Sequence, residues 1–304
     1  MQIAIIAVPY DLGRHNLGHG KGPDRLINSG LERKLVKHGH KIERITLAYD
    51  PTHQLTETQS AFRLNAMLSS AVAEAIAAGR WPLILAGNCM TALGTLSGIG
   101  KKETGILWLD AHADFNTPET TESGYLDGMA LSVACGRCWK SLAAMDQRYC
   151  PIPADQVVLV GTRDIDADEA QLLDQSHVKM VNPAQLRHAH YQLPKHSQPA
   201  VHDYYLHLDA DVLDSEIGAA NGFASAGGVN PDEVARLFTW VAENYTVSAL
   251  AITAFSPDHD TTGTIRQALA KLIVGGIDVI AKRRDASGRP SKPPNGPQGP
   301  DKRS

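Results

Sequence analysis

Short apolar runs alternate with amphipathic stretches along most of the chain. Runs of about four to eight apolar residues, rich in Val, Ile and Leu, are typical of strands buried on both faces of a parallel sheet. Eight such runs occur, at residues 2–8, 41–47, 82–87, 105–110, 156–161, 177–181, 203–209 and 248–254. The pattern therefore predicts about eight buried strands.

Between these runs, apolar residues recur with the helical period. Residues 57–79 carry Leu64, Leu68, Val72 and Ile76 at a spacing of four, which predicts an amphipathic helix. A second helix is expected to begin at Pro231, because Asn230 can cap it and Pro is favoured in the first turn. A last helix is predicted over residues 260–283.

Strands that alternate with helices favour an α/β fold. We expect a three-layer α/β/α sandwich with a mainly parallel sheet of about eight strands, formed by residues 1–283 as a single domain. Residues 284–304 are rich in Pro, Gly and basic side chains, so we expect a disordered tail there.

Composition and charge exclude several classes of protein. The 304 residues carry a formal net charge of -4 with a pI of about 6.3, which gives no electrostatic case for nucleic-acid binding. No apolar run is long enough to span a membrane, and the first residues indicate a strand rather than a signal peptide. Four cysteines in so long a chain form no disulfide framework, so the cytoplasm is the expected compartment.

Two of the predicted strands end in acidic motifs. Asp110, His112 and Asp114 follow the run at 105–109, and Asp209 and Asp211 follow the run that begins at Tyr204. If the strand period of two continued, each motif would project to one side of the sheet. Four carboxylates and an imidazole with no Lys or Arg among them repel one another unless cations neutralise them. The donors suit Mn²⁺, Mg²⁺ or Zn²⁺.

The chain resembles the arginase/agmatinase (ureohydrolase) family over most of residues 1–282. The motifs that carry the resemblance are Gly20-Lys21-Gly22-Pro23, residues 110–118 (DAHADFNTP), residues 161–166 (GTRDID) and residues 209–214 (DADVLD). Residues 115–129 are most similar to the hydroxyarginine amidinohydrolase of cycloserine biosynthesis.

The resemblance implies a two-manganese centre whose bridging hydroxide attacks a guanidinium-type carbon. It implies that Asp110 and Asp209 bridge both ions. Asp114 would complete the shell of one ion, and His112 with Asp211 the shell of the other.

The sixth ligand of the family is a His in the turn after the third strand, and here the position is Cys89. A thiolate binds divalent ions but suits Mn²⁺ less than imidazole does, so Zn²⁺ or Fe²⁺ competes with Mn²⁺. The alternative is a small buried thiol that binds no metal.

A second departure concerns proton transfer. Family members commonly carry a His where this chain has Asp127. A carboxyl group at Asp127 could pass a proton to a leaving amine, or Asp127 could be a solvated loop residue. His259 is a candidate replacement for that His, or an ordinary surface residue.

A third departure concerns the substrate. The family's Glu that pairs with the guanidinium aligns with Ala254, and a Thr that faces the same group aligns with Phe223. The loss of a carboxylate and a hydroxyl removes the bonds that select a cation. A neutral or less basic amidino, hydroxyguanidino or amide group therefore fits better than a plain guanidinium.

The residues that would bind the amino-acid end of the substrate match those of the family. Asn116, Ser123 and Asp166 match positions that in arginases hold the α-carboxylate and α-amino groups of the substrate. Bonds from these side chains to the backbone of a turn are the alternative.

Two weaker signals remain. His207 lies two residues before Asp209 and is expected on the same side of its strand, as a hydrogen-bond partner of a metal ligand or as a core residue. Cys135 and Cys138 form an isolated C-x-x-C, which is weak evidence for zinc binding or thiol exchange.

These observations predict a metal-dependent hydrolase of a linear C–N bond in a small amino-acid-derived substrate such as hydroxyarginine. A non-catalytic or regulatory homologue and a zinc-type amide deacetylase are the alternatives. A homo-oligomer, either a trimer or a hexamer, is expected by family analogy.

Overall fold

The computed structural model describes residues 1–49, 55–101, 103–188, 193–194 and 201–286. Within these residues, eight parallel strands form one sheet in the order β4-β1-β5-β10-β9-β6-β7-β8. The strands are β1 (Gln2–Val8), β4 (Lys41–Thr46), β5 (Trp81–Ala86), β6 (Thr104–Leu109), β7 (Val157–Val160), β8 (Lys179–Val181), β9 (Asp203–Asp209) and β10 (Thr246–Thr253). All eight predicted strands are present, with ends that differ by up to two residues.

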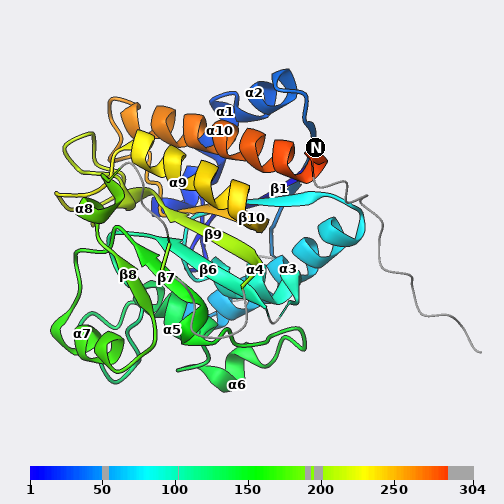
Figure 1. Cartoon of the computed structure of the whole chain (residues 1–304). Helices are drawn as coiled ribbons and strands as arrows, with labels where there is room; N and C mark the ends of the chain where they lie inside the picture. The colour runs from blue at the N-terminus through cyan, green and yellow to red at the C-terminus, as the bar shows by residue number, and fades with distance from the viewer. Residues whose placement is uncertain (50–54, 102, 189–192, 195–200, 287–304) are drawn as a thin grey trace, which may run out of the picture.

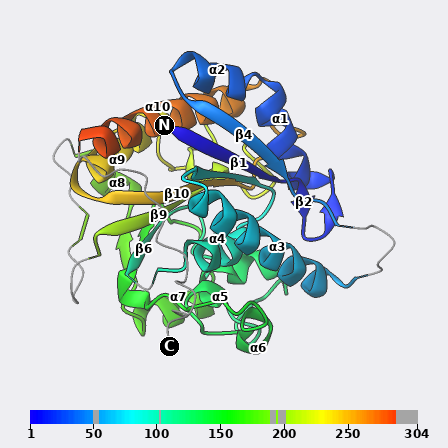
Figure 2. The same ribbon diagram turned by 90° about the vertical axis from the view of Figure 1, so that its right-hand side faces the viewer.

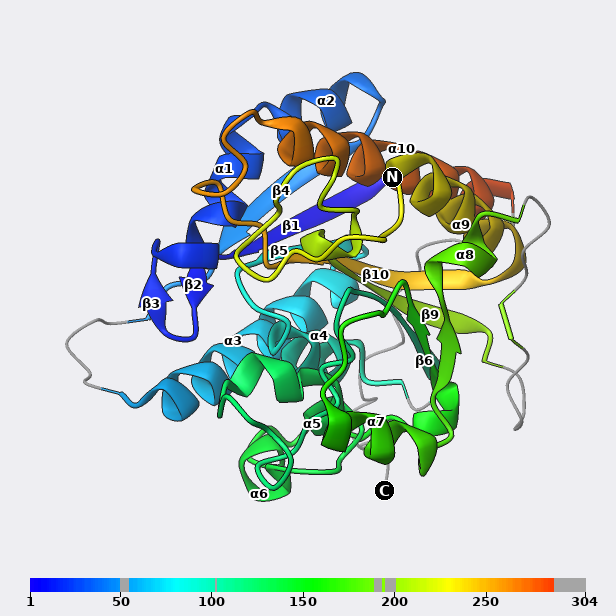
Figure 3. The ribbon, with the colours of Figure 1, turned by 90° about the vertical axis from the view of Figure 1, so that its left-hand side faces the viewer.

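Helices cover both faces of the sheet, which confirms the three-layer sandwich (Figures 1 and 2). One face carries α1 (Gly22–Asn28), α2 (Leu31–Lys37), α8 (Pro183–Leu186), α9 (Pro231–Asn244) and α10 (Thr264–Ala286). The other carries α3 (Glu57–Ala77), α4 (Thr91–Ile99), α5 (Ala130–Ala134), α6 (Lys140–Ala143) and α7 (Ala167–Asp174). A small hairpin, β2 (Tyr10–Asp11) with β3 (Arg14–His15), projects from the sheet (Figure 3).

The sequence explains how the two faces are filled. Ile3 and Ile5 of β1 pack into one core, whereas Ala4 and Ile6 pack into the other, as the strand period of two requires. Asn230 caps α9 through its side chain, and Glu233 completes a capping box. The predicted start of α9 is therefore confirmed.

The predicted end of the last helix, residue 283, was three residues too early. Helix α10 continues past residue 283 to Ala286. Lys, Arg and Ala are good helix formers, and cations are favourable near a helix C-terminus, so the basic residues extend the helix. Residues 287–304, the rest of the predicted disordered tail, lie outside the described residues. No helix in the described part of the chain is both long and apolar enough to cross a membrane.

Candidate metal centre

A cavity of about 320 Å³ opens at the carboxyl ends of β5, β6, β9 and β10. This is the edge at which parallel sheets bind their ligands. Twelve of the thirteen residues predicted to bind metal, bind substrate or transfer a proton line it: Cys89, Asp110, His112, Asp114, Asn116, Ser123, Asp127, Asp166, Asp209, Asp211, Phe223 and Ala254. No Lys or Arg is among the described residues that line it.

His259 is the exception. It is exposed and its Nδ1 lies 3.0 Å from the Ser256 hydroxyl, outside the lining of the cavity. Of the two interpretations of His259, its exposure agrees with the ordinary surface residue.

The acidic side chains point into the cavity for a different structural reason from the one predicted. Strand β6 ends at Leu109, and Asp114 has a left-handed backbone with φ of 50°. Asp211 lies in a 3-10 turn, η4 (Ala210–Val212), where the Asp209 carboxylate accepts the Asp211 N–H at 2.9 Å. The side chains converge because the chain turns sharply after each strand, not because the strand period continues.

Asp110 lies at the centre of the acidic group. Its Oδ1 accepts the His112 N–H at 2.8 Å, and its Oδ2 accepts the Trp108 Nε1–H at 3.0 Å. Burial and then the charge of Asp211 raise the pKa of Asp110 to about 7. Burial likewise raises the pKa of Asp114 and of Asp209 well above the usual range, with nearby carboxylates adding to it.

The imidazole of His112 lies between two carboxylates. Its Nδ1 is 3.4 Å from Asp110 and 3.5 Å from Asp211. Burial opposes protonation, but Asp110 and then Asp211 raise the pKa of His112 to about 9. The carboxylates around His112 therefore favour a positive charge at this point of the protein.

The donor atoms fit two adjacent ions. In one group the ligand atoms of Asp110, His112 and Asp211 lie within 4.8 Å of one another, and in a second group so do those of Cys89, Asp110 and His207. Asp110 belongs to both groups, as a bridging carboxylate would. The residues present therefore fit a pair of divalent cations.

Cys89 is positioned by the turn that follows β5. Gly87 is required there, since a Cβ atom would lie 2.1 Å from the carbonyl oxygen of Tyr10. The Cys89 thiol donates to Asp209 at 3.0 Å, and burial raises its pKa well above the usual value. In the absence of a cation Cys89 is thus a neutral thiol that faces an acidic cavity.

Asp127 is buried rather than solvated. Its Oδ1 accepts the Met90 N–H at 2.8 Å and its Oδ2 accepts an N–H of Asn88 at 3.0 Å. Asn88 in turn accepts the Leu12 N–H at 2.6 Å. Burial raises the pKa of Asp127, although these hydrogen bonds lower it. The solvated-loop interpretation of Asp127 is therefore wrong.

The residues predicted to bind the amino-acid end of the substrate make hydrogen bonds within the protein. Asn116 donates to Asp166 at 3.0 Å. Ser123 is exposed and accepts the Tyr125 N–H at 3.1 Å, which is the turn-stabilising bond expected as the alternative. Both side chains nevertheless line the cavity.

Several lining residues were missed by sequence reasoning. Some lie within the motifs quoted above and others outside them: Thr121, Glu122, Tyr125 and Gly128 within residues 115–129, Asp164 within residues 161–166, and His19, Glu169 and Asn221 outside both. Glu169 was detectable as a carboxylate three residues after Asp166, and burial raises its pKa to about 7. No local pattern indicates His19, which reaches the site from the short helix before α1.

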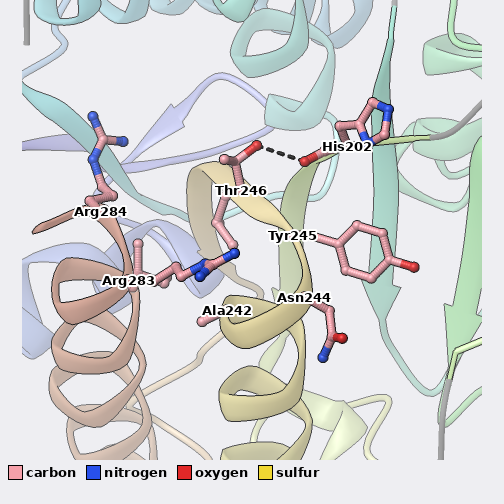
Figure 4. A pocket seen from close by; sticks show the side chains of 9 residues that line it. His202, Ala242, Asn244, Tyr245, Thr246, Arg283 and Arg284 are labelled. Atoms are coloured by element: carbon pink, nitrogen blue, oxygen red, sulfur yellow. Dashed lines mark hydrogen bonds between the residues drawn. The ribbon is translucent and has the colours of Figure 1, made fainter. Parts of the chain in front are cut away.

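Two further features, a second cavity and the C-x-x-C pair, lie outside the acidic cavity. A second cavity, of about 400 Å³, lies where β9 and β10 begin, with Arg283, Arg284 and Tyr245 in its lining (Figure 4). None of its described lining residues is Asp, Glu or Cys. Burial raises the pKa of Cys135 and of Cys138 to about 12, so this C-x-x-C offers no thiolate near neutral pH.

The parallel sheet and the acidic cavity at its carboxyl edge define an α/β protein of the ureohydrolase class. The chain belongs to the arginase family, whose model matches residues 1–276. This family depends on two metal ions, and the donor groups around Asp110 are consistent with that.

Individual relatives support the assignment. The arginase of Brevibacillus brevis is 30% identical over 242 residues, which cover 75% of this chain and 81% of that protein. The arginase of Bacillus caldovelox is 26% identical, with 90% of this chain and 98% of that protein covered. The crystal structure of Bacillus subtilis arginase has a TM-score of 0.79 at 25% identity, covering 91% of this chain and 98% of that one.

Proposed function

We propose that the protein hydrolyses a linear C–N bond in an amino-acid-derived substrate whose amidino group is less basic than a plain guanidinium, such as hydroxyarginine. The observation that carries the proposal is the composition of the cavity. Acidic donors fill one side, whereas Ala254 and Phe223 stand where the family resemblance implies a Glu and a Thr. The similarity of residues 115–129 to a hydroxyarginine amidinohydrolase supports the same substrate.

Two divalent ions belong to this proposal, with Mn²⁺ expected and Zn²⁺ or Fe²⁺ competing because of Cys89. When bound, such ions supply Lewis acidity and activate water at neutral pH. Asp110, His112, Asp114, Asp209 and Asp211 would hold them together with Cys89. No Lys or Arg among the described lining residues neutralises these carboxylates.

Asp127 is the proposed proton carrier. Its carboxyl group lines the cavity, and the bonds from Asn88 and Met90 fix its orientation. Burial raises the pKa of Asp127, which brings it closer to the pH at which a carboxyl group can both take up and release a proton. It would deliver that proton to the leaving nitrogen as the C–N bond breaks.

The entrance to the cavity favours a flat and weakly charged group. Phe223 is 54% exposed, and its ring centroid lies 5.9 Å from that of Tyr125 and 6.3 Å from that of His112. Ala254 adds an apolar surface below it. An amidino group can contact these surfaces without the carboxylate that a full positive charge requires. Asn116, Ser123 and Asp166 would bind the amino-acid end of the substrate.

The test is a substrate screen with Mn²⁺, Zn²⁺ or Fe²⁺ added to the metal-free protein. Urea or hydroxyurea release is measured from arginine, hydroxyarginine, agmatine and guanidinobutyrate, and amine release from acylated polyamines. We expect hydroxyarginine to have the highest kcat/KM. Higher kcat/KM for arginine contradicts the substrate assignment, and no turnover with any metal favours the non-catalytic homologue.

A matched pair of variants tests the role of Ala254. Ala254→Glu restores an acceptor carboxylate and should shift the ratio of kcat/KM toward arginine, whereas Ala254→Gln, of nearly equal size, should not. Equal effects of both variants contradict the charge argument. Turnover of acylated polyamines instead of amidines supports the amide deacetylase, which the absence of a guanidinium acceptor at Ala254 also favours.

Of the remaining proposals, the oligomeric state follows from family analogy and the compartment from the small number of cysteines. We propose a cytoplasmic homo-oligomer, either a trimer or a hexamer, that acts on small molecules. Light scattering coupled to size-exclusion chromatography measures the molar mass directly, and a mass of a single chain of 32.7 kDa would contradict it.

A further inference from the structure

Cys89 faces an imidazole that does not belong to the lining of the cavity. His207 lies on β9, two residues before Asp209, and is fully buried. Its Nε2 is 3.2 Å from the Cys89 Sγ. The ligand atoms of His207, Cys89 and Asp110 lie within 4.8 Å of one another. Bonds from Zn²⁺ to N, O and S are about 2.0–2.3 Å long, so one ion reaches all three atoms after small shifts.

The two ring nitrogens of His207 face different partners. The Tyr205 hydroxyl lies 2.9 Å from Nδ1, and the Cys89 sulfur lies 3.2 Å from Nε2. In the neutral tautomer that carries its proton on Nδ1, the Tyr205 oxygen accepts from Nδ1 and Nε2 presents its lone pair on the Cys89 side.

The ring of His207 is also fixed in orientation. Trp108 stacks on it with ring centroids 3.5 Å apart and planes 5° apart. The same indole donates its Nε1–H to the Asp110 carboxylate at 3.0 Å. One tryptophan thus orients two of the three donors. Such support is typical of groups that bind metal ions.

We propose that His207 is a direct imidazole ligand and that Cys89, Asp110 and His207 hold a borderline ion such as Zn²⁺. This deepens the proposed function, because it concerns one of the two ions at the same site. A thiolate and an imidazole favour Zn²⁺ over Mn²⁺, whereas the group of His112 and Asp211 next to it provides harder donors. The centre would then hold two unlike ions.

The competing role for His207 is a hydrogen bond to a ligand without contact to the ion. The Thr253 hydroxyl lies 3.1 Å from His207 Nε2 and could donate a hydrogen bond to its lone pair. The two roles can be distinguished by whether the ion forms a direct bond to His207 Nε2. A His207 that only makes a hydrogen bond to a ligand forms no such bond.

The experiment uses the full chain, stripped of metal, labelled with ¹⁵N-histidine and loaded with one equivalent of ¹¹³Cd²⁺. NMR should show a one-bond coupling between cadmium and Nε2 of His207, and a cadmium chemical shift that indicates sulfur ligation. His207→Gln should remove that coupling and weaken cadmium binding at least about tenfold. His177→Gln, which removes an exposed histidine outside the proposed site, should change neither the cadmium–nitrogen coupling of His207 nor the affinity for cadmium.

A sulfur-bound cadmium ion without coupling to His207 would overturn the proposal, as would failure of cadmium to bind. If His207→Gln does not fold, the coupling in the unaltered protein still decides the question. The readout does not depend on turnover. A protein that hydrolyses none of the amidines but shows the coupling would refute the proposed function and leave this metal site in place.

Discussion

Removal of divalent ions should make the stability of the protein fall steeply as the pH rises. Burial and the charge of Asp211 raise the pKa of Asp110 from its usual 3.8 to about 7. Between these values the folded state holds a proton that the unfolded state has released, so the free energy of unfolding decreases with increasing pH. His112, with a pKa of about 9 in place of 6.5, contributes with the same sign between pH 6.5 and 9.

The magnitude follows from the size of these shifts. One pKa unit corresponds to about 1.4 kcal/mol, so the whole shift of Asp110 corresponds to about 4 kcal/mol. About 2 kcal/mol of this is lost between pH 5 and pH 7, because a group with a pKa of about 7 is only half titrated at pH 7, and His112 adds a further contribution up to pH 8. That is a large fraction of the 5–15 kcal/mol that stabilises a typical domain.

The assay is urea denaturation of chelator-treated protein, followed by circular dichroism at pH 5 and pH 8. We expect a clearly lower urea midpoint at pH 8 and its recovery when Mn²⁺ or Zn²⁺ is added, because ions bind the ionised carboxylates of the folded state. Asp110→Asn should reduce the pH dependence of the metal-free protein, although Asp114 and Asp209 still contribute with the same sign, and should abolish most of the recovery. A metal-free protein as stable at pH 8 as at pH 5 would refute the reasoning.

Three further predictions test single contacts. Asn88→Ala should lower kcat through loss of the bond to Asp127 and destabilise the fold by about 1–3 kcal/mol, as measured by steady-state kinetics and urea denaturation; an unchanged kcat contradicts the positioning of that carboxyl group. Trp108→Phe removes the donor to Asp110 and should weaken metal binding about 10–100-fold in calorimetric titration, and wild-type affinity would count against it. Asn230→Ala removes the cap of α9 and should cost about 1 kcal/mol in thermal denaturation with turnover unchanged, so a loss of kcat would show that α9 does more than support the sheet.

The fold could be predicted because parallel strands buried on both faces appear as continuous apolar runs. Strand β9, with every residue from Asp203 to Asp209 buried, is an example. The end of α10 was placed too early because a run of charged residues resembles the start of a tail, although the same residues are good helix formers.

The metal donors could be predicted from their residue types. The geometry that brings them together could not be predicted from the sequence. Asp110 follows β6 and Asp209 ends β9, and these two strands neighbour each other in the sheet, which the sequence positions do not reveal. The contact between His207 and Cys89 joins β9 to the turn after β5, 118 residues away along the chain. The two interpretations of His259 could not be separated from the sequence, because the direction of a side chain in a turn depends on backbone angles that its neighbours do not specify.

Anomalous X-ray diffraction from crystals grown with Mn²⁺ and Zn²⁺, recorded at both absorption edges, tests the central claim most directly. We predict two peaks on either side of Asp110, one next to His112 and Asp211 and one within bonding distance of the Cys89 sulfur. The absence of any peak in the cavity, or a single ion that touches neither Asp110 nor Asp209, would contradict the account.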